Sequence, residues 1–125
     1  MLIRAGTRPE DLRSTGLRQW SNDRFWIGWK GHLYRPGRDA GAASIAALAG
    51  DLLSAPLAEK VGQLRGVYGV FVHDRQDGSW QVASDHLGFY RLYYDREVLG
   101  TKLLDLMADR GYGPADLDPE RLTEF

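Results

Sequence analysis

The most informative pattern of apolar and polar residues lies in residues 64–94, which read LRGVYGVFVHDRQDGSWQVASDHLGFYRLYY. Residues 66–73 are an apolar run rich in β-branched and aromatic side chains, typical of a strand covered on both faces. Residues 74–79 are polar and contain Asp77-Gly78, a pair that tolerates the positive φ of a tight turn. Residues 80–83 and 89–94 are again typical of strands. The pattern predicts three short strands that form an antiparallel meander.

In the first third of the chain, the pattern of residues predicts one long strand and little other regular structure. Residues 24–34 alternate, with Phe25, Ile27 and Trp29 on one face. The other face has Trp26, Gly28 and Lys30. Residues 1–5 predict a short strand, and residues 7–20 are polar and irregular. Within them, Thr7 at the N-cap with Pro9 in the first turn would start a short helix.

The middle of the chain predicts a pair of helices that pack on a sheet. Asp39 precedes an Ala-rich segment and is suited to the N-cap position. Four apolar residues of this segment recur at helical spacing and would face the sheet: Ile45, Leu48, Ala49 and Leu52. A shorter helix is predicted from Leu57, Val61 and Leu64, and it leads into the strand at residue 66.

Composition narrows the class of protein. The chain has 125 residues, the size of one small domain, and 43% hydrophobic residues. The formal net charge is −1, from 16 basic and 17 acidic residues, so charge gives no reason to expect nucleic acid or an anionic membrane as a partner. No apolar run has the length of a membrane span or of a signal-peptide core, so we expect a cytoplasmic protein. The chain has no cysteine, which excludes disulfides and thiol nucleophiles.

Three short motifs together resemble a known family. GVYGVFVHD at residues 66–74, ASDHLG at 83–88 and LYY at 92–94 resemble the glutaminase-type domain of asparagine synthetases and their relatives, a class II glutamine amidotransferase domain. Residues 99–106 stand where that family has a helix, and residues 117–125 look like the segment leading toward the synthetase domain. The resemblance implies an α+β fold: a trimmed four-layer αββα sandwich of mainly antiparallel sheets, of the N-terminal nucleophile hydrolase type, formed by residues 1–125 as a single degenerate domain.

The resemblance also implies that the glutaminase chemistry is lost. The family uses an N-terminal cysteine as its nucleophile, and this chain has Leu2 after the initiator Met. The family's oxyanion-hole Asn is replaced by Lys30, followed by Gly31 and His32, and Asp39 loosely matches an Asp that binds glutamine. These four residues would form a vestigial pocket with no catalytic residue. A hydrolase that exposed Thr7 by cleavage is a further alternative, although capping explains that residue.

A second set of residues belongs to the turn and strand after the central hairpin. The resemblance places five residues of this region near an interface with the synthetase domain: Asp85, His86, Gly88, Tyr93 and Tyr94. The alternative is structural, with Asp85 bonding to backbone N–H groups and Gly88 at a positive φ. The three histidines have no metal-ligand spacing, and no phosphate-binding loop is present, so we expect no metal and no cofactor.

The expected function is therefore that of a non-catalytic domain or subunit. It would support an ATP-dependent, asparagine-synthetase-like enzyme that forms amides, as in β-lactam synthetases and lasso peptide cyclases, which resemble the family but lack the cysteine. The expected partner is that ligase chain or a second copy of this chain as a homodimer. The alternative is a free-standing module that binds an amino acid or peptide in the vestigial pocket.

Overall fold

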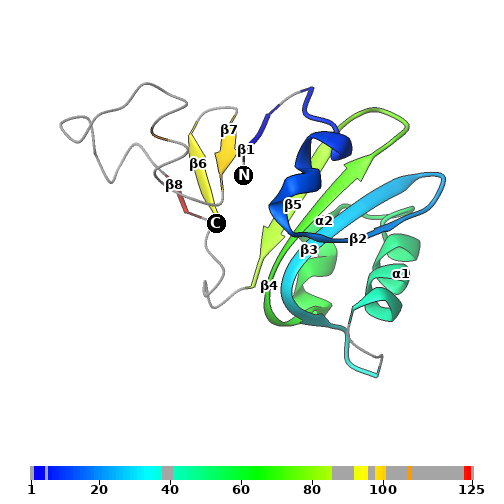
Figure 1. The fold of residues 1–125 in the computed structure, drawn as a ribbon. Helices are drawn as coiled ribbons and strands as arrows, with labels where there is room; N and C mark the ends of the chain where they lie inside the picture. The colour runs from blue at the N-terminus through cyan, green and yellow to red at the C-terminus, as the bar shows by residue number, and fades with distance from the viewer. Residues whose placement is uncertain are drawn as a thin grey trace. The chain divides into compact units, whose positions relative to one another are not determined.

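The computed structural model describes residues 2–4, 6–37, 41–85, 92–95, 98–100, 107 and 123–124. The chain divides into two compact units, each of which contains one four-stranded sheet (Figure 1). Arg8–Tyr90 form the larger unit, and Met1–Thr7 with Arg91–Phe125 form the smaller one. All pairings between the described strands are antiparallel, so the expectation of a mixed α/β fold with antiparallel sheets is confirmed.

The sheet of the larger unit has the strand order β2-β3-β4-β5. Its strands are β2 (Arg18–Ser21), β3 (Phe25–Tyr34), β4 (Arg65–Asp74) and β5 (Trp80–Ser84). Three of them match predicted strands, and the register of β3 and β4 continues without interruption over the whole length of both. The prediction that residues 7–20 are irregular is wrong, because β2 begins at Arg18 and pairs with β3.

Two helices cover one face of this sheet. They are α1 (Ala42–Asp51) and α2 (Leu57–Lys60), and α2 continues into a 3₁₀ turn, η2 (Val61–Gln63). The four apolar residues predicted to face the sheet are all buried. They form one core with residues of β3 and β4: Phe25, Ile27, Trp29, Leu33, Tyr68, Val70 and Val72. Gln81 of β5 ties the layers together, because its Oε1 accepts a hydrogen bond from the Leu57 N–H at 2.7 Å.

The two predicted helix caps are wrong by one or two residues. The N-cap of α1 is Gly41, with a φ of 76° that favours glycine, whereas Asp39 lies outside the described residues. The 3₁₀ helix η1 (Pro9–Thr15) is capped at Arg8, whose N–H donates to the Asp11 carboxylate at 2.9 Å. The predicted cap Thr7 instead accepts a hydrogen bond from the Arg4 N–H at 3.0 Å.

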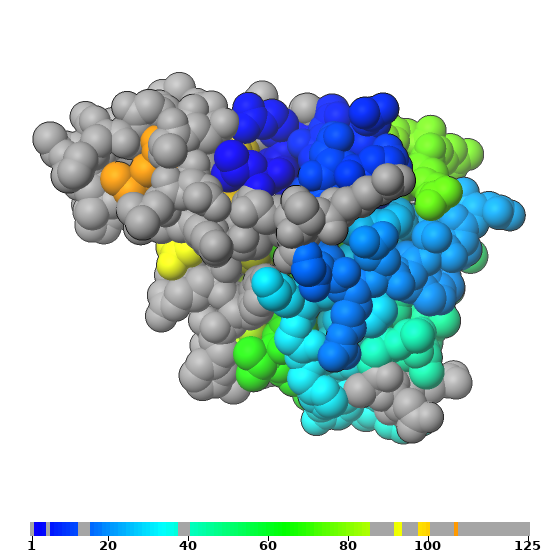
Figure 2. Space-filling view, viewed as in Figure 1, coloured from blue at the N-terminus to red at the C-terminus, as the bar shows by residue number. Residues whose placement is uncertain are grey.

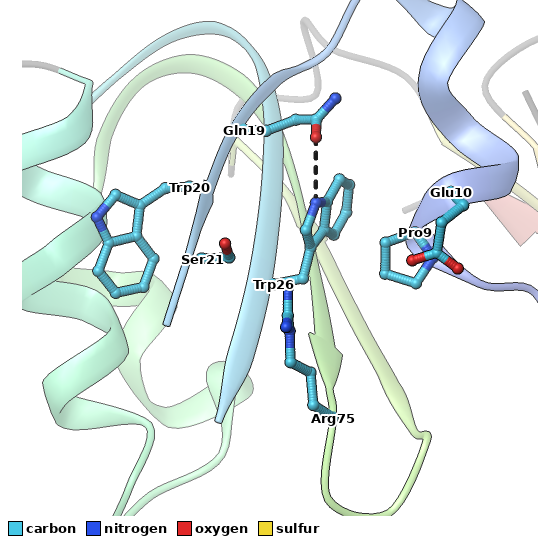
Figure 3. A pocket seen from close by; sticks show the side chains of 7 residues that line it. All are labelled: Pro9, Glu10, Gln19, Trp20, Ser21, Trp26 and Arg75. Atoms are coloured by element: carbon cyan, nitrogen blue, oxygen red, sulfur yellow. Dashed lines mark hydrogen bonds between the residues drawn. The ribbon is translucent and has the colours of Figure 1, made fainter. Parts of the chain in front are cut away.

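The other face of the sheet is approached by η1, which lies on the side opposite α1 (Figure 3). Leu12 of η1 and Leu17 are buried, at 3% and 9% exposure. The Trp26 indole lies over Gly28, because a Cβ at Gly28 would approach Trp26 Cζ3 to 2.9 Å and Leu17 Cδ1 to 3.1 Å. Larger side chains at Gly28 would therefore displace an aromatic ring.

An ion pair joins the β2–β3 hairpin to the end of β4. The Arg24 guanidinium donates two hydrogen bonds to the Asp74 carboxylate, from Nε and Nη2, each at 3.0 Å. Asp74 is only 6% exposed and also accepts from the Gln76 N–H at 2.8 Å. The hydrogen bonds from Arg24 hold the pKa of Asp74 below its usual value. The following turn has Gly78 at a φ of 76°, as the Asp-Gly pair predicted.

The smaller unit has the strand order β1-β7-β6-β8. Its strands are β1 (Leu2–Ile3), β6 (Tyr93–Asp95), β7 (Val98–Gly100) and β8 (Thr123–Glu124). The predicted meander is wrong, because β6 pairs with β7 and β8 and not with β5.

The helix that the resemblance placed at residues 99–106 is also contradicted at its start, because Leu99 and Gly100 belong to a strand. The number of residues between the strands explains why β6 pairs with β7 and not with β5. Residues 85–92 separate β5 from β6, which is more than the roughly two to five residues of a common hairpin loop, whereas residues 96–97 alone separate β6 from β7.

Candidate functional site

The residues of the expected vestigial pocket lie in the second half of β3. Lys30, Gly31 and His32 are all exposed, and Asp39 lies outside the described residues. The His32 ring contacts the Tyr34 ring, with centroids 5.5 Å apart. No hydrogen bond or ion pair fixes the Lys30 ammonium within the described part of the chain. An ammonium on a flexible side chain differs from the rigid amide donor that an oxyanion hole needs.

The backbone geometry of the sheet is enough to explain why residue 31 is a glycine. Its φ is 86°, and a Cβ there would overlap the Val67 carbonyl oxygen and approach Tyr68 Cα to 3.2 Å. Gly66 on the opposite strand has a φ of 110°, and its Cβ would overlap the His32 carbonyl oxygen. The backbones of β3 and β4 therefore pass so close that two glycines are needed there.

Asp85 is buried at the end of β5 and is 3% exposed. Its Oδ1 accepts from the Tyr68 N–H at 3.3 Å, and its own N–H donates to the Tyr68 carbonyl at 3.0 Å. These contacts give Asp85 a structural role against the neighbouring strand. The turn interpretation, in which Asp85 bonds forward to the next backbone N–H groups, concerns residues from 86 on, which lie outside the described residues. His86 and Gly88 lie outside the described residues. Tyr93 and Tyr94 belong to β6, where they pair with Gly100 and Leu99.

Two buried donors face the helical layer without a hydrogen-bond acceptor among the described residues. They are Trp29 Nε1 and the Tyr68 hydroxyl, on residues that are 4% and 1% exposed. Burial raises the pKa of Tyr68, and the nearby Asp85 charge raises it further. The hydroxyl is therefore held in its neutral form, and it is not suited to act as a base.

A pocket of about 260 Å³ lies between η1 and the outer face of β2 and β3 (Figure 3). Its lining comes from three parts of the chain: Pro9, Glu10, Gln19, Trp20, Ser21, Trp26 and Arg75. The side chain of Trp20 points to the α1 side, whereas Trp26 points into the space below η1 (Figure 3). Gln19 holds the Trp26 indole, because its Oε1 accepts from Trp26 Nε1 at 3.3 Å.

The charges around this pocket are one carboxylate and one guanidinium. Glu10 and Arg75 are both exposed. Within the described ranges, Glu10 forms an ion pair with Arg8, whose Nε lies 3.9 Å from Glu10 Oε2. Arg75 makes no ion pair with any described residue, and it also borders a second hollow lined by Asp23, Arg24 and Gln76. The pocket therefore has a guanidinium that can bind an anion and a carboxylate that can bind a cation, and both groups are open to solvent.

An aromatic row extends from this pocket across the sheet. Trp26, His73 and Trp80 are cross-strand neighbours on β3, β4 and β5. The Trp80 ring lies 4.8 Å from the His73 ring and 5.9 Å from the Trp26 ring. His73 Nδ1 is buried and has no hydrogen-bond partner among the described residues. Burial lowers the pKa of His73; the charge of Glu10 opposes this and that of Arg75 adds to it, so both charges lie near this imidazole.

No pattern of residues in the sequence predicts this pocket. Glu10, Gln19 and Arg75 stand in segments that were predicted to be a helix start, an irregular stretch and a turn. A predicted β2 would have placed Gln19 opposite Gly28 and Ser21 opposite Trp26, which is half of the pocket. The contribution of Arg75 carries no signal in the sequence.

Comparisons with known proteins add no assignment: no family model, curated protein or solved structure matches this chain. Within the described ranges, no group of three or more His, Cys, Asp or Glu side chains is arranged to hold a metal ion. None of the described helices is long and apolar enough to cross a membrane.

Proposed function

We propose that this chain is a non-catalytic, cytoplasmic domain or subunit of the glutamine amidotransferase type, which supports an ATP-dependent, asparagine-synthetase-like enzyme that forms amides. The observation that carries the proposal is the residue at the nucleophile position. Leu2 lies in β1, paired with Gly100 of β7, and provides no nucleophilic atom there. The absence of cysteine from the whole chain agrees with this.

Three features of the fold support the proposal. Both sheets are antiparallel, a pair of helices connects β3 to β4, and that pair packs on one face of its sheet. A trimmed four-layer αββα sandwich would use the two sheets as its inner layers. Since the chain would contribute no nucleophile, its value to a ligase would be to bind and position the ligase chain, while the amine comes from the ligase's own substrate.

The experiment that tests this proposal is an ammonia-release assay with glutamine. We expect no release above a heat-denatured control, and we expect none from Leu2→Cys either, because an exposed Lys30 does not replace a fixed amide donor. Release by the natural chain would overturn the proposal. Release by Leu2→Cys would show that the remainder of a glutaminase site is intact.

The partner is tested by co-expression with an asparagine-synthetase-like ligase chain. A stable complex needs an interface of about 1,200–2,000 Å² in total. We expect a mixed complex, whose size is measured by light scattering, and a homodimer of the isolated chain is the second form the proposal allows. A chain that stays monomeric in both settings would count against the proposal.

The alternative function is that of a free-standing module that binds an amino acid or peptide. The pocket of Figure 3 favours it, since that pocket combines an indole with two charges of opposite sign. None of Lys30, Gly31 or His32 lines this pocket, so the module would bind its ligand away from the vestigial pocket. Ligand binding together with failure to bind any ligase chain would favour this alternative.

A further inference from the structure

We propose that the pocket between η1 and the outer face of β2 and β3 binds a free α-amino acid as a zwitterion. Arg75 would bind the carboxylate, Glu10 would bind the ammonium, and the Trp26 indole would contact the apolar part of the ligand. This inference stands on the pocket itself and does not rest on the proposed function.

The size of the pocket limits the ligand to a small molecule. Its volume of about 260 Å³ is below the roughly 300–1,000 Å³ that drug-sized ligands occupy. With about 30 Å³ for each water molecule in the liquid, it holds the equivalent of roughly nine waters. A free amino acid fits this volume.

The two charges define the chemistry of the ligand. Arg75 has a guanidinium without a partner among the described residues, and a guanidinium binds a carboxylate through two parallel hydrogen bonds. Among the described residues, the ion-pair partner of Glu10 is Arg8, at a long distance of 3.9 Å, which a ligand ammonium can replace. Both groups line the same pocket, so they belong to one site.

The uncharged lining completes the site. Gln19 uses its Oε1 to hold Trp26, and its amide NH₂ remains as a donor. Trp26 itself is 5% exposed, so its ring is fixed before any ligand arrives. A wall that is already ordered reduces the entropy lost when a ligand binds.

The experiment follows the Trp26 indole N–H by nuclear magnetic resonance during titration of the full chain. L-Alanine, L-leucine and L-glutamine are titrated separately into the millimolar range. We expect at least one of them to shift this signal in a saturable way. The N-acetyl and the carboxamide derivatives of the same amino acid should bind at least about tenfold more weakly, because each loses one charge-assisted hydrogen-bonded group.

Variants locate the binding. Arg75→Gln and Glu10→Gln should each weaken binding of the amino acid by about tenfold or more, and both residues are exposed, so the fold should persist. Lys30→Gln and Glu59→Gln are the matched controls, because each removes the same charge from an exposed residue outside the pocket. The inference is overturned if none of the three amino acids binds, if the derivatives bind equally well, or if Lys30→Gln abolishes binding while Arg75→Gln does not.

Discussion

Replacing Gly31 by Ala tests whether this glycine is required by the backbone of the sheet. The substitution should cost about 1–2 kcal/mol because Gly31 has a φ of 86°. A further cost of about 1–3 kcal/mol should come from overpacking, since the added Cβ would overlap the Val67 carbonyl and lie 3.1 Å from the Val67 carbonyl carbon. The clash is with backbone, which cannot rotate away as a side chain can. We therefore expect a loss of about 2–5 kcal/mol of unfolding free energy.

The matched control is Gly78→Ala in the β4–β5 turn. Gly78 also has a positive φ, of 76°, but a Cβ there would meet nothing within 4 Å. Its substitution should cost only the conformational term, about 1–2 kcal/mol. The difference between the two variants isolates the close approach of β3 and β4.

Urea unfolding followed by tryptophan fluorescence measures this difference. All four tryptophans lie in the larger unit, so the signal reports on the sheet that contains Gly31. With a slope of about 1–3 kcal/mol per molar urea, the midpoint of Gly31→Ala should be on the order of 1 M below that of Gly78→Ala. Equal urea midpoints for the two variants would refute the steric argument, and Gly31 would then need a functional explanation.

Three further predictions concern buried polar groups of the larger unit. Tyr68→Phe should raise the urea midpoint by an amount equivalent to about 1 kcal/mol or more, because it removes a buried hydroxyl that has no hydrogen-bond partner among the described residues; a lower midpoint would reveal a hydrogen bond. Asp74→Ala should cost about 2–3 kcal/mol, since it removes both bonds from Arg24, and a loss no greater than that of the exposed Asp77→Ala would count against this ion pair. The pKa of His73 is lowered by burial, so below about pH 6.5 the unfolded chain binds a proton that the folded chain does not. The free energy of unfolding should therefore fall as the pH decreases from about 6.5 to the folded pKa of His73. His73→Gln should flatten that part of a pH series of urea midpoints, and an unchanged slope would contradict the prediction.

The parts of the fold that the sequence predicted are those with a strong period. β3 alternates in sequence, β4 contains a continuous apolar run rich in β-branched and aromatic residues, and α1 repeats its apolar side chains at helical spacing. β2 was missed because RQWS is short and mostly exposed at the edge of the sheet, where burial leaves no pattern. The partner of β6 was missed because pairing between strands is a tertiary property, which the period of a single strand does not encode.

The candidate site was less predictable than the fold. Lys30, Gly31 and His32 were found through a resemblance, and the structure places them on an exposed part of β3. The pocket around Trp26 depends on the register between β2 and β3 and on where the turn places Arg75. These are relations between distant segments, and no local pattern of residue types reports them.

The most direct test of the proposed function is the rate of ATP-dependent amide formation by a purified asparagine-synthetase-like ligase, measured with and without this chain. Free glutamine is omitted, so that only the amine of the ligase's own substrate can react. The account predicts a faster rate when the chain is present, the same increase with Leu2→Ala, and co-elution of the two chains. An unchanged rate without a complex, or a rate that rises only when glutamine is added, would contradict it.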